Sequence, residues 1–236
     1  MTTVRRILRS RWLHGSVVVS VLLFGLIGFA HTPAGRPLLN ALRGAPGCPV
    51  DLTLLSPANV EKARIAAISK RQGTALEASR RALGFELGVT HKGAVLAYMK
   101  KHGVACETSR EESVLRCTEA PSELSPGSAP RIDDLHMQFD TEQRLVAVDV
   151  FRADASSDVA VAWLKAMDEK LTSEVGPATG KHGEASVSFL EAGALRRTAN
   201  EYRYQGYVAQ LSAMRIGKRG VRVREQYQWV PTGTKG

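Results

Sequence analysis

The sequence predicts an α+β fold: an N-terminal membrane helix, followed by an exported domain in which a few helices pack against an antiparallel meander sheet. Three observations support this prediction. An uncharged apolar run lies near the start of the chain, strand-like runs are separated by single helical segments, and short turns join most of the strand-like runs. Strands that follow one another through short turns pair antiparallel, because a parallel pair needs a long crossover.

Residues 12–30 carry no formal charge and are preceded by four arginines, Arg5, Arg6, Arg9 and Arg11. A helix needs roughly 20 apolar residues to cross a hydrocarbon core, so this run is long enough to be a retained membrane anchor. A signal peptide that is cleaved after Ala30 is the competing interpretation. In both cases the arginines predict a cytoplasmic N-terminus and a periplasmic C-terminal domain.

Residues 31–55 are rich in proline and glycine and are predicted to be a linker, so residues 56–236 form the exported domain. The whole chain has a net charge of +9, whereas the part from residue 31 onward has +5 once the four N-terminal arginines are set aside. This mild excess predicts attraction to anionic envelope surfaces, weakened by salt. It gives no reason to expect a nucleic-acid partner.

The first part of the exported domain begins with helical spacing over residues 56–83. Ser56 is a suitable N-cap with proline after it, and Gly73 interrupts the pattern so that residues 76–83 form a second helix. Thr90 is expected to cap a helix that ends near residue 101. Strands are expected at 104–107 and 113–118, and residues 135–139 and 145–151 alternate as a hairpin.

The second part begins with a helix capped by Ser156 or Ser157. Its apolar stripe consists of Val159, Ala160, Trp163, Leu164, Met167 and Leu171. Strands are then expected at 186–190, 200–216 and 221–230, with a tight turn at 217–220 between the last two. Residues 84–152 and 156–230 thus read as two αβββ-like halves, each a helix followed by a meander.

The chain has three cysteines, and an oxidising compartment favours their cross-linking. Cys106 and Cys117 fall on strands expected to be neighbours, so they are the preferred disulfide pair. Cys48 is then left free or available for a bridge to another chain.

Gly88-Val89-Thr90, the following short helix with Val95, and Gly103 before the strands resemble a motif of small envelope lipoproteins. These are the helix-then-meander modules of the outer-membrane assembly family, whose fold is similar to that of β-lactamase-inhibitor-like proteins. The likeness covers residues 84–152, with an echo around 157–230. It implies a binding module without catalysis. Val95 lies one residue later than in that motif, and the lipidated cysteine is missing.

Motifs of familiar enzymes are missing from the sequence. It has no Gly-x-Ser-x-Gly elbow, no Cys-x-x-Cys pair and no phosphate-binding glycine pattern. We therefore assign no catalytic residue, cofactor or metal ligand.

A cell-wall-directed or metal-dependent hydrolase is the alternative function. Its candidate carboxylate pairs are Asp133-Asp134 and Glu111-Glu112, and its candidate metal ligands are His102, Cys106, Cys117 and Cys48. A disulfide beside a helix-terminal histidine explains the same residues without a metal.

Arginines and a lysine gather on the last hairpin. Together with one arginine before it, they form a candidate surface for anions or a partner: Arg203, Arg215, Lys218, Arg219, Arg222 and Arg224. Guanidinium groups pair with phosphate and carboxylate. Arg222 and Arg224 share a strand face with Gln226 and Gln228, whereas Val221, Val223, Tyr227 and Trp229 face the core. An edge strand protected by charge is the simpler interpretation.

The sequence therefore predicts a non-enzymatic, membrane-anchored binding or structural module of a bacterial-type cell envelope. Its expected partners are the membrane, through residues 12–30, and an envelope protein or anionic envelope component.

Overall fold

The computed structural model describes residues 56–109, 112–120, 124, 130–217 and 220–231. The predicted anchor at 12–30, the linker at 31–55 and Cys48 lie outside these residues. Within the described ranges, no helix is both long enough and apolar enough to cross a membrane. The elements in chain order are α3 (Pro57–Ser69), β1 (Arg81–Ala82), β2 (Phe85–Glu86), α4 (Lys92–Lys101), β3 (Cys106–Ser109), β4 (Val114–Thr118), β5 (Asp134–Phe139), β6 (Leu145–Ala155), α5 (Ser157–Glu174), β7 (Gly180–His182), α6 (Val187–Glu191), β8 (Leu195–Arg203), β9 (Tyr207–Ile216) and β10 (Val221–Trp229).

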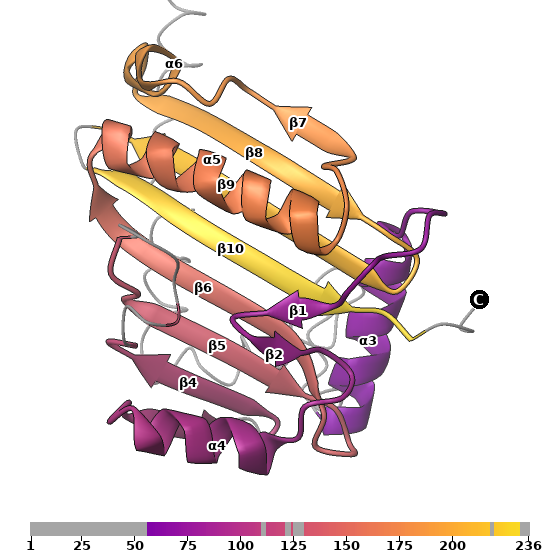
Figure 1. The fold of residues 1–236 in the computed structure, drawn as a ribbon. Coiled ribbons are helices and arrows are strands. Elements are labelled where there is room, and N and C mark those ends of the chain that lie inside the picture. The colour runs from indigo at the N-terminus through magenta and orange to yellow at the C-terminus, as the bar shows by residue number, and fades with distance from the viewer. Residues whose placement is uncertain (1–55, 110–111, 121–123, 125–129, 218–219, 232–236) are drawn as a thin grey trace, which may run out of the picture. The chain divides into compact units, whose positions relative to one another are not determined.

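Eight strands form one sheet in the order β3-β4-β5-β6-β10-β9-β8-β7 (Figure 1). Each pair of neighbours is antiparallel. The sequence prediction of an α+β fold with an antiparallel sheet and a few helices is thus confirmed. The order is symmetric about the boundary between β6 and β10, with four strands on each side of that boundary.

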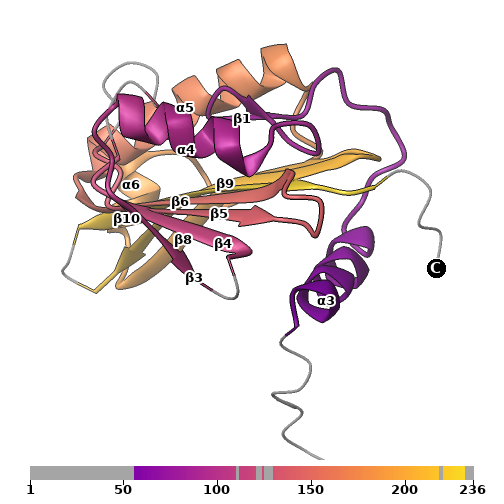
Figure 2. The ribbon, with the colours of Figure 1, turned by 90° about the horizontal axis from the view of Figure 1, so that it is seen from below.

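Helices α4 and α5 and the β1–β2 hairpin lie on one face of the sheet (Figure 2). The stripe of α5 is buried as predicted, except for Val159, which is exposed. On the sheet, alternate residues such as Leu135 and Met137 of β5 point into the same core. This helix-covered face therefore holds the main hydrophobic core, and the opposite face is called the open face below.

The structure corrects several predicted elements. Residues 76–83 do not form a second helix. Leu83 and Gly84 have positive φ angles, 52° and 83°, and form the two-residue turn of the β1–β2 hairpin. The predicted strand at 186–190 is instead α6, because the Ser186 side chain accepts a hydrogen bond from Phe189 N and caps a helix.

Two further boundaries differ from the prediction. The single strand expected at 200–216 is two strands, β8 and β9, which are joined by a turn over residues 204–206. The cap of α4 is His91 and not Thr90, whose hydroxyl accepts a hydrogen bond from Glu86 N. The predicted cap of the first helix is confirmed, since Ser56 Oγ accepts from Asn59 N.

The predicted disulfide is confirmed. Cys106 on β3 and Cys117 on β4 are directly opposite in the strand register and are bonded, with their Cα atoms 4.1 Å apart. The bridge joins the edge strand β3 to the rest of the sheet.

Gly73 lies where the segment after α3 meets the end of β8. Its N–H donates to Tyr204 O, and a Cβ atom there would lie 1.9 Å from Arg203 O. We expect Gly73→Ala to lower the free energy of unfolding by about 2 kcal/mol, because backbone must move to admit the methyl group. Gly93→Ala is the matched control for urea unfolding, since a Cβ atom on this helical residue meets no atom within 4 Å. Equal unfolding energies for both variants would contradict the predicted clash.

Candidate functional site

The open face carries side chains that alternate with the core residues along each strand. Among the described elements, α3 covers one end of this face. Ile68 of α3 packs against Val208 and Val230, and Arg64 Nη1 donates a hydrogen bond to Trp229 O over 2.8 Å. The rest of the open face is not covered by any described helix (Figure 2).

Strand β10 shows how the sequence places these side chains. Its residues at 221, 223, 225 and 227 are buried in the core, whereas Arg222, Arg224, Gln226 and Gln228 lie on the open face. This agrees with the predicted alternation, except that Trp229 is only half-buried. The strand lies between β6 and β9, so the interpretation of β10 as an edge strand is wrong.

At the centre of the open face, Arg224 is held by two residues of β6. Its Nη2 atom donates to Asp149 Oδ1 over 2.6 Å, and its guanidinium lies 5.0 Å from the centre of the Phe151 ring. The ring of His136, on β5, lies 5.6 Å from the Phe151 ring. An aromatic ring and an ion pair thus occupy adjacent positions on three neighbouring strands.

A second ion pair joins β4 to β5. Arg116 Nη2 lies 2.8 Å from Asp134 Oδ2, and His136 Nε2 lies 3.1 Å from Asp134 Oδ1. The hydrogen bond from Arg116 lowers the pKa of the Asp134 carboxyl below its usual value. Asp134 is therefore ionised at neutral pH and its charge is balanced on the surface.

Glu201 organises the polar groups on the β8 side. It accepts hydrogen bonds from Arg203 and, over 2.8 Å, from Gln210 Nε2. Arg197 Nη2 in turn donates to Gln210 Oε1 over 2.9 Å. His182 on β7 lies 3.8 Å from the same carboxylate.

The six predicted anion-binding residues do not form one cationic strip. Arg203 and Arg224 are on the open face and are paired with carboxylates. Arg215 lies on the helix-covered face, where its Nη1 is 3.5 Å from Glu191 Oε1. The Arg222 side chain is exposed and forms no hydrogen bond or ion pair with any described residue. Lys218 and Arg219 lie outside the described residues.

The groups considered for hydrolysis have other partners. Asp133 Oδ2 accepts a hydrogen bond from Ala153 N, and the exposed His102 ring lies 4.4 Å from the Tyr98 ring. Cys106 and Cys117 are oxidised to a disulfide, so neither offers a thiolate to a metal. In the part of the chain that the structure describes, no three His, Cys, Asp or Glu residues are placed to hold a metal ion. Glu111 lies outside that part.

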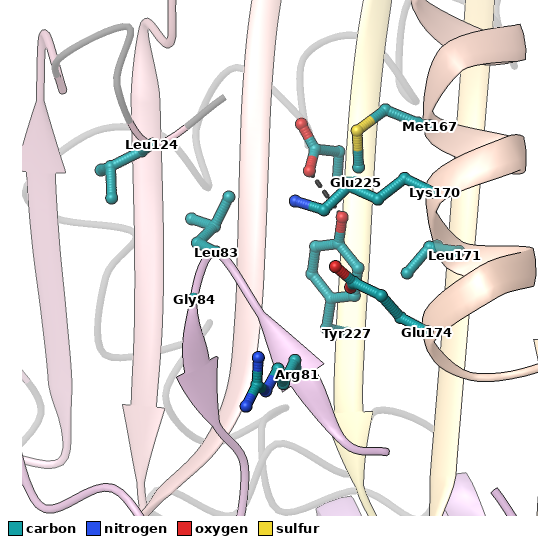
Figure 3. Close-up of a pocket in the computed structure, with 10 residues that line it drawn as sticks. All are labelled: Arg81, Leu83, Gly84, Leu124, Met167, Lys170, Leu171, Glu174, Glu225 and Tyr227. Carbon is teal, nitrogen blue, oxygen red and sulfur yellow. Dashed lines mark hydrogen bonds between the residues drawn. The ribbon is translucent and has the colours of Figure 1, made fainter. Parts of the chain in front are cut away.

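The helix-covered face has a small pocket of about 70 Å³ between the β1–β2 hairpin, α5 and β10. Lys170 and Glu174 extend from α5 toward Tyr227, and Arg81 lies on the hairpin side (Figure 3). Tyr227 Oη donates to Glu225 Oε2 over 2.6 Å. Burial raises the pKa of the Tyr227 hydroxyl far above its usual value, so it remains a donor.

The Glu225 carboxylate in this pocket belongs to a buried ion pair. Arg152 Nη2 lies 2.6 Å from Glu225 Oε1, and each side chain is 1% exposed. Arg152 also donates to Pro130 O and lies 6.0 Å from the Trp163 ring. Because both oxygens of Glu225 are engaged, the pair joins β6 to β10 as a structural element.

Sequence reasoning missed this pair. A signal for it was present, because Glu225 occupies an inward-facing position between Val223 and Tyr227 in the alternation of β10.

The described residues form an α+β domain with the Cys106–Cys117 disulfide and an open sheet face that carries mainly paired charges. Comparisons of the chain with protein-family models, curated proteins and solved structures find no significant match. The resemblance to small envelope modules stays a prediction from the sequence.

Proposed function

We propose that this protein is a non-enzymatic binding module of the cell envelope that docks a partner protein on the open face of its sheet. The observation that carries the proposal is the open face itself, which lies opposite α4 and α5 and is lined by polar side chains with aromatic and arginine residues among them. The anchor at residues 12–30 and the linker at 31–55 would hold this module at the periplasmic side of the membrane.

The size of the face suits a protein partner. Eight strands at about 4.8 Å spacing make the open face roughly 34 Å wide. Its four longest strands, β6, β8, β9 and β10, have 9 to 11 residues each and are roughly 30–35 Å long. Because β3, β4, β5 and β7 are only 3 to 6 residues long, the sheet as a whole covers roughly 900 Å², which is close to the roughly 800 Å² that each partner buries in a standard interface.

The composition of the face also favours a protein over a polyanion. The described strand positions on this face include Arg116, Arg197, Arg203, Arg222 and Arg224 but no lysine. Arginine is enriched and lysine is depleted in protein interfaces. Since three of the five arginines are already paired with carboxylates, the face is nearly balanced in charge and fits a surface of mixed charge.

We also propose that the domain consists of two halves, residues 84–152 and 156–230, which meet at the β6–β10 pair. The symmetric strand order supports this division, although each half contributes four strands to the sheet instead of the predicted three. The centre of the open face, at Arg224 and Phe151, then lies on the junction between the halves.

Cross-linking and purification of the tagged full-length protein from its native membranes tests the proposal. We expect Arg222→Glu/Arg224→Glu to reduce partner recovery at least tenfold, because reversal at Arg224 places a second carboxylate next to that of Asp149. Lys101→Glu/Lys165→Glu, at exposed positions of α4 and α5, is the charge-matched control and should recover the partner normally. If both variants are folded, as judged by circular dichroism, equal recovery of the partner would contradict the proposed docking face.

A further inference from the structure

One corner of the open face, where β8 begins, β9 ends and β10 begins, is more apolar than the rest of the face. Leu195 and Ile216 are directly opposite in the register of β8 and β9, and 72% and 39% of their surfaces are exposed. In the next open-face row, Met214 lies between Arg197 on β8 and Arg222 on β10. We call these five residues the corner patch.

The arginines of the corner patch differ from those at the centre of the face. The Arg197 guanidinium donates only to the neutral side chain of Gln210, and the Arg222 side chain has no partner among the described residues. Of the acids at this end of the sheet, Glu191 pairs with Arg215 on the helix-covered face, and Asp154 of β6 forms no ion pair with either arginine. The corner patch thus combines exposed apolar surface with two cations that lack a carboxylate.

This difference matters for binding energy. The ion pairs at the centre of the open face must be desolvated when a partner covers them, so they contribute little net affinity. Burial of exposed apolar side chains is favourable in itself, and an unpaired arginine gains a new ion pair with the partner. Interfaces concentrate their binding energy in a few such positions.

We infer that the corner patch is the energetic centre of the docking surface and that it binds an acidic segment of the partner protein that also carries an exposed apolar side chain. This inference rests on the proposed function and adds the chemistry of the partner. The partner segment must be acidic because it faces Arg197 and Arg222. It must carry an apolar side chain because it also covers Leu195, Met214 and Ile216.

A photo-cross-linking amino acid in place of Leu195, in the full-length protein in native membranes, tests the inference. Mass spectrometry of the adduct should identify a protein segment with net negative charge and at least one large apolar residue. The same amino acid in place of Leu76, which is 75% exposed outside the open face, is the matched control and should give no such adduct. Arg197→Glu/Arg222→Glu should reduce the Leu195 adduct at least tenfold.

Three outcomes overturn the inference: a basic or uncharged segment in the adduct, lipid as the sole adduct, or an adduct yield that the arginine reversals leave unchanged. The proposed function is tested separately by partner recovery with the single variant Arg224→Glu. If that single variant loses the partner while the Leu195 position yields no acidic segment, the inference fails and the docking face stands. If Arg224→Glu also leaves recovery unchanged, both fail.

Discussion

Replacement of Glu225 with alanine is expected to lower the free energy of unfolding by about 3–5 kcal/mol. Arg152 and Glu225 are both almost completely buried, and their ion pair joins the two central strands. The variant leaves the Arg152 guanidinium inside the protein without its carboxylate and removes the acceptor of the Tyr227 hydroxyl. Urea unfolding at neutral pH, followed by circular dichroism, measures the loss.

A variant that removes the whole polar group separates this effect from the loss of packing. Arg152→Met/Glu225→Leu/Tyr227→Phe leaves no uncompensated charge in the core, and apolar replacement of a buried ion pair is often neutral or stabilising. We expect it to be at least about 2 kcal/mol more stable than Glu225→Ala. If Glu225→Ala costs less than about 1 kcal/mol, the pair is not the structural element that the geometry indicates.

Loss of the disulfide should have the second-largest effect on stability. Cys106 and Cys117 are separated by 11 positions, and release of a loop of this size costs about 2–3 kcal/mol in the chain-entropy account. We expect Cys106→Ser/Cys117→Ser to unfold at lower urea than the oxidised protein and at the same urea as the reduced wild type. Cys48→Ser, which leaves the pair intact, is the control. A loss as large in that control would mean that Cys48 also contributes to a structural bridge.

Much of the fold was predictable where one periodicity extends over many residues. The stripe of α5 and the alternation of the β5–β6 hairpin gave the correct elements, and the pairing of Cys106 with Cys117 followed from neighbouring strands. The errors occurred in short segments. Residues 76–83 show helical spacing, but a two-residue turn at Leu83-Gly84 decides their structure, and a single cap at Ser186 decides α6. Local hydrogen bonds outweigh a weak pattern in such segments.

The candidate site was predictable only in part. Alternation in β10 correctly placed Arg222 and Arg224 on one face. It could not show that Asp149, 75 residues away in sequence, neutralises Arg224, because that contact depends on the pairing of β6 with β10. The same pairing brings Arg152 to Glu225. Sequence therefore indicated which residues share a strand face, whereas the strand order decided which of their charges are free.

The most direct test of the docking face places a photo-cross-linking amino acid on each side of the sheet in turn. Gln210 and Gln226 lie opposite each other in the register of β9 and β10 on the open face, and Lys165 and Glu169 are exposed on α5. In native membranes, we expect a protein adduct from the two glutamine positions and none from the two α5 positions. Adducts from α5 alone, or equal adducts from both sides, would contradict the assignment of the open face as the binding surface.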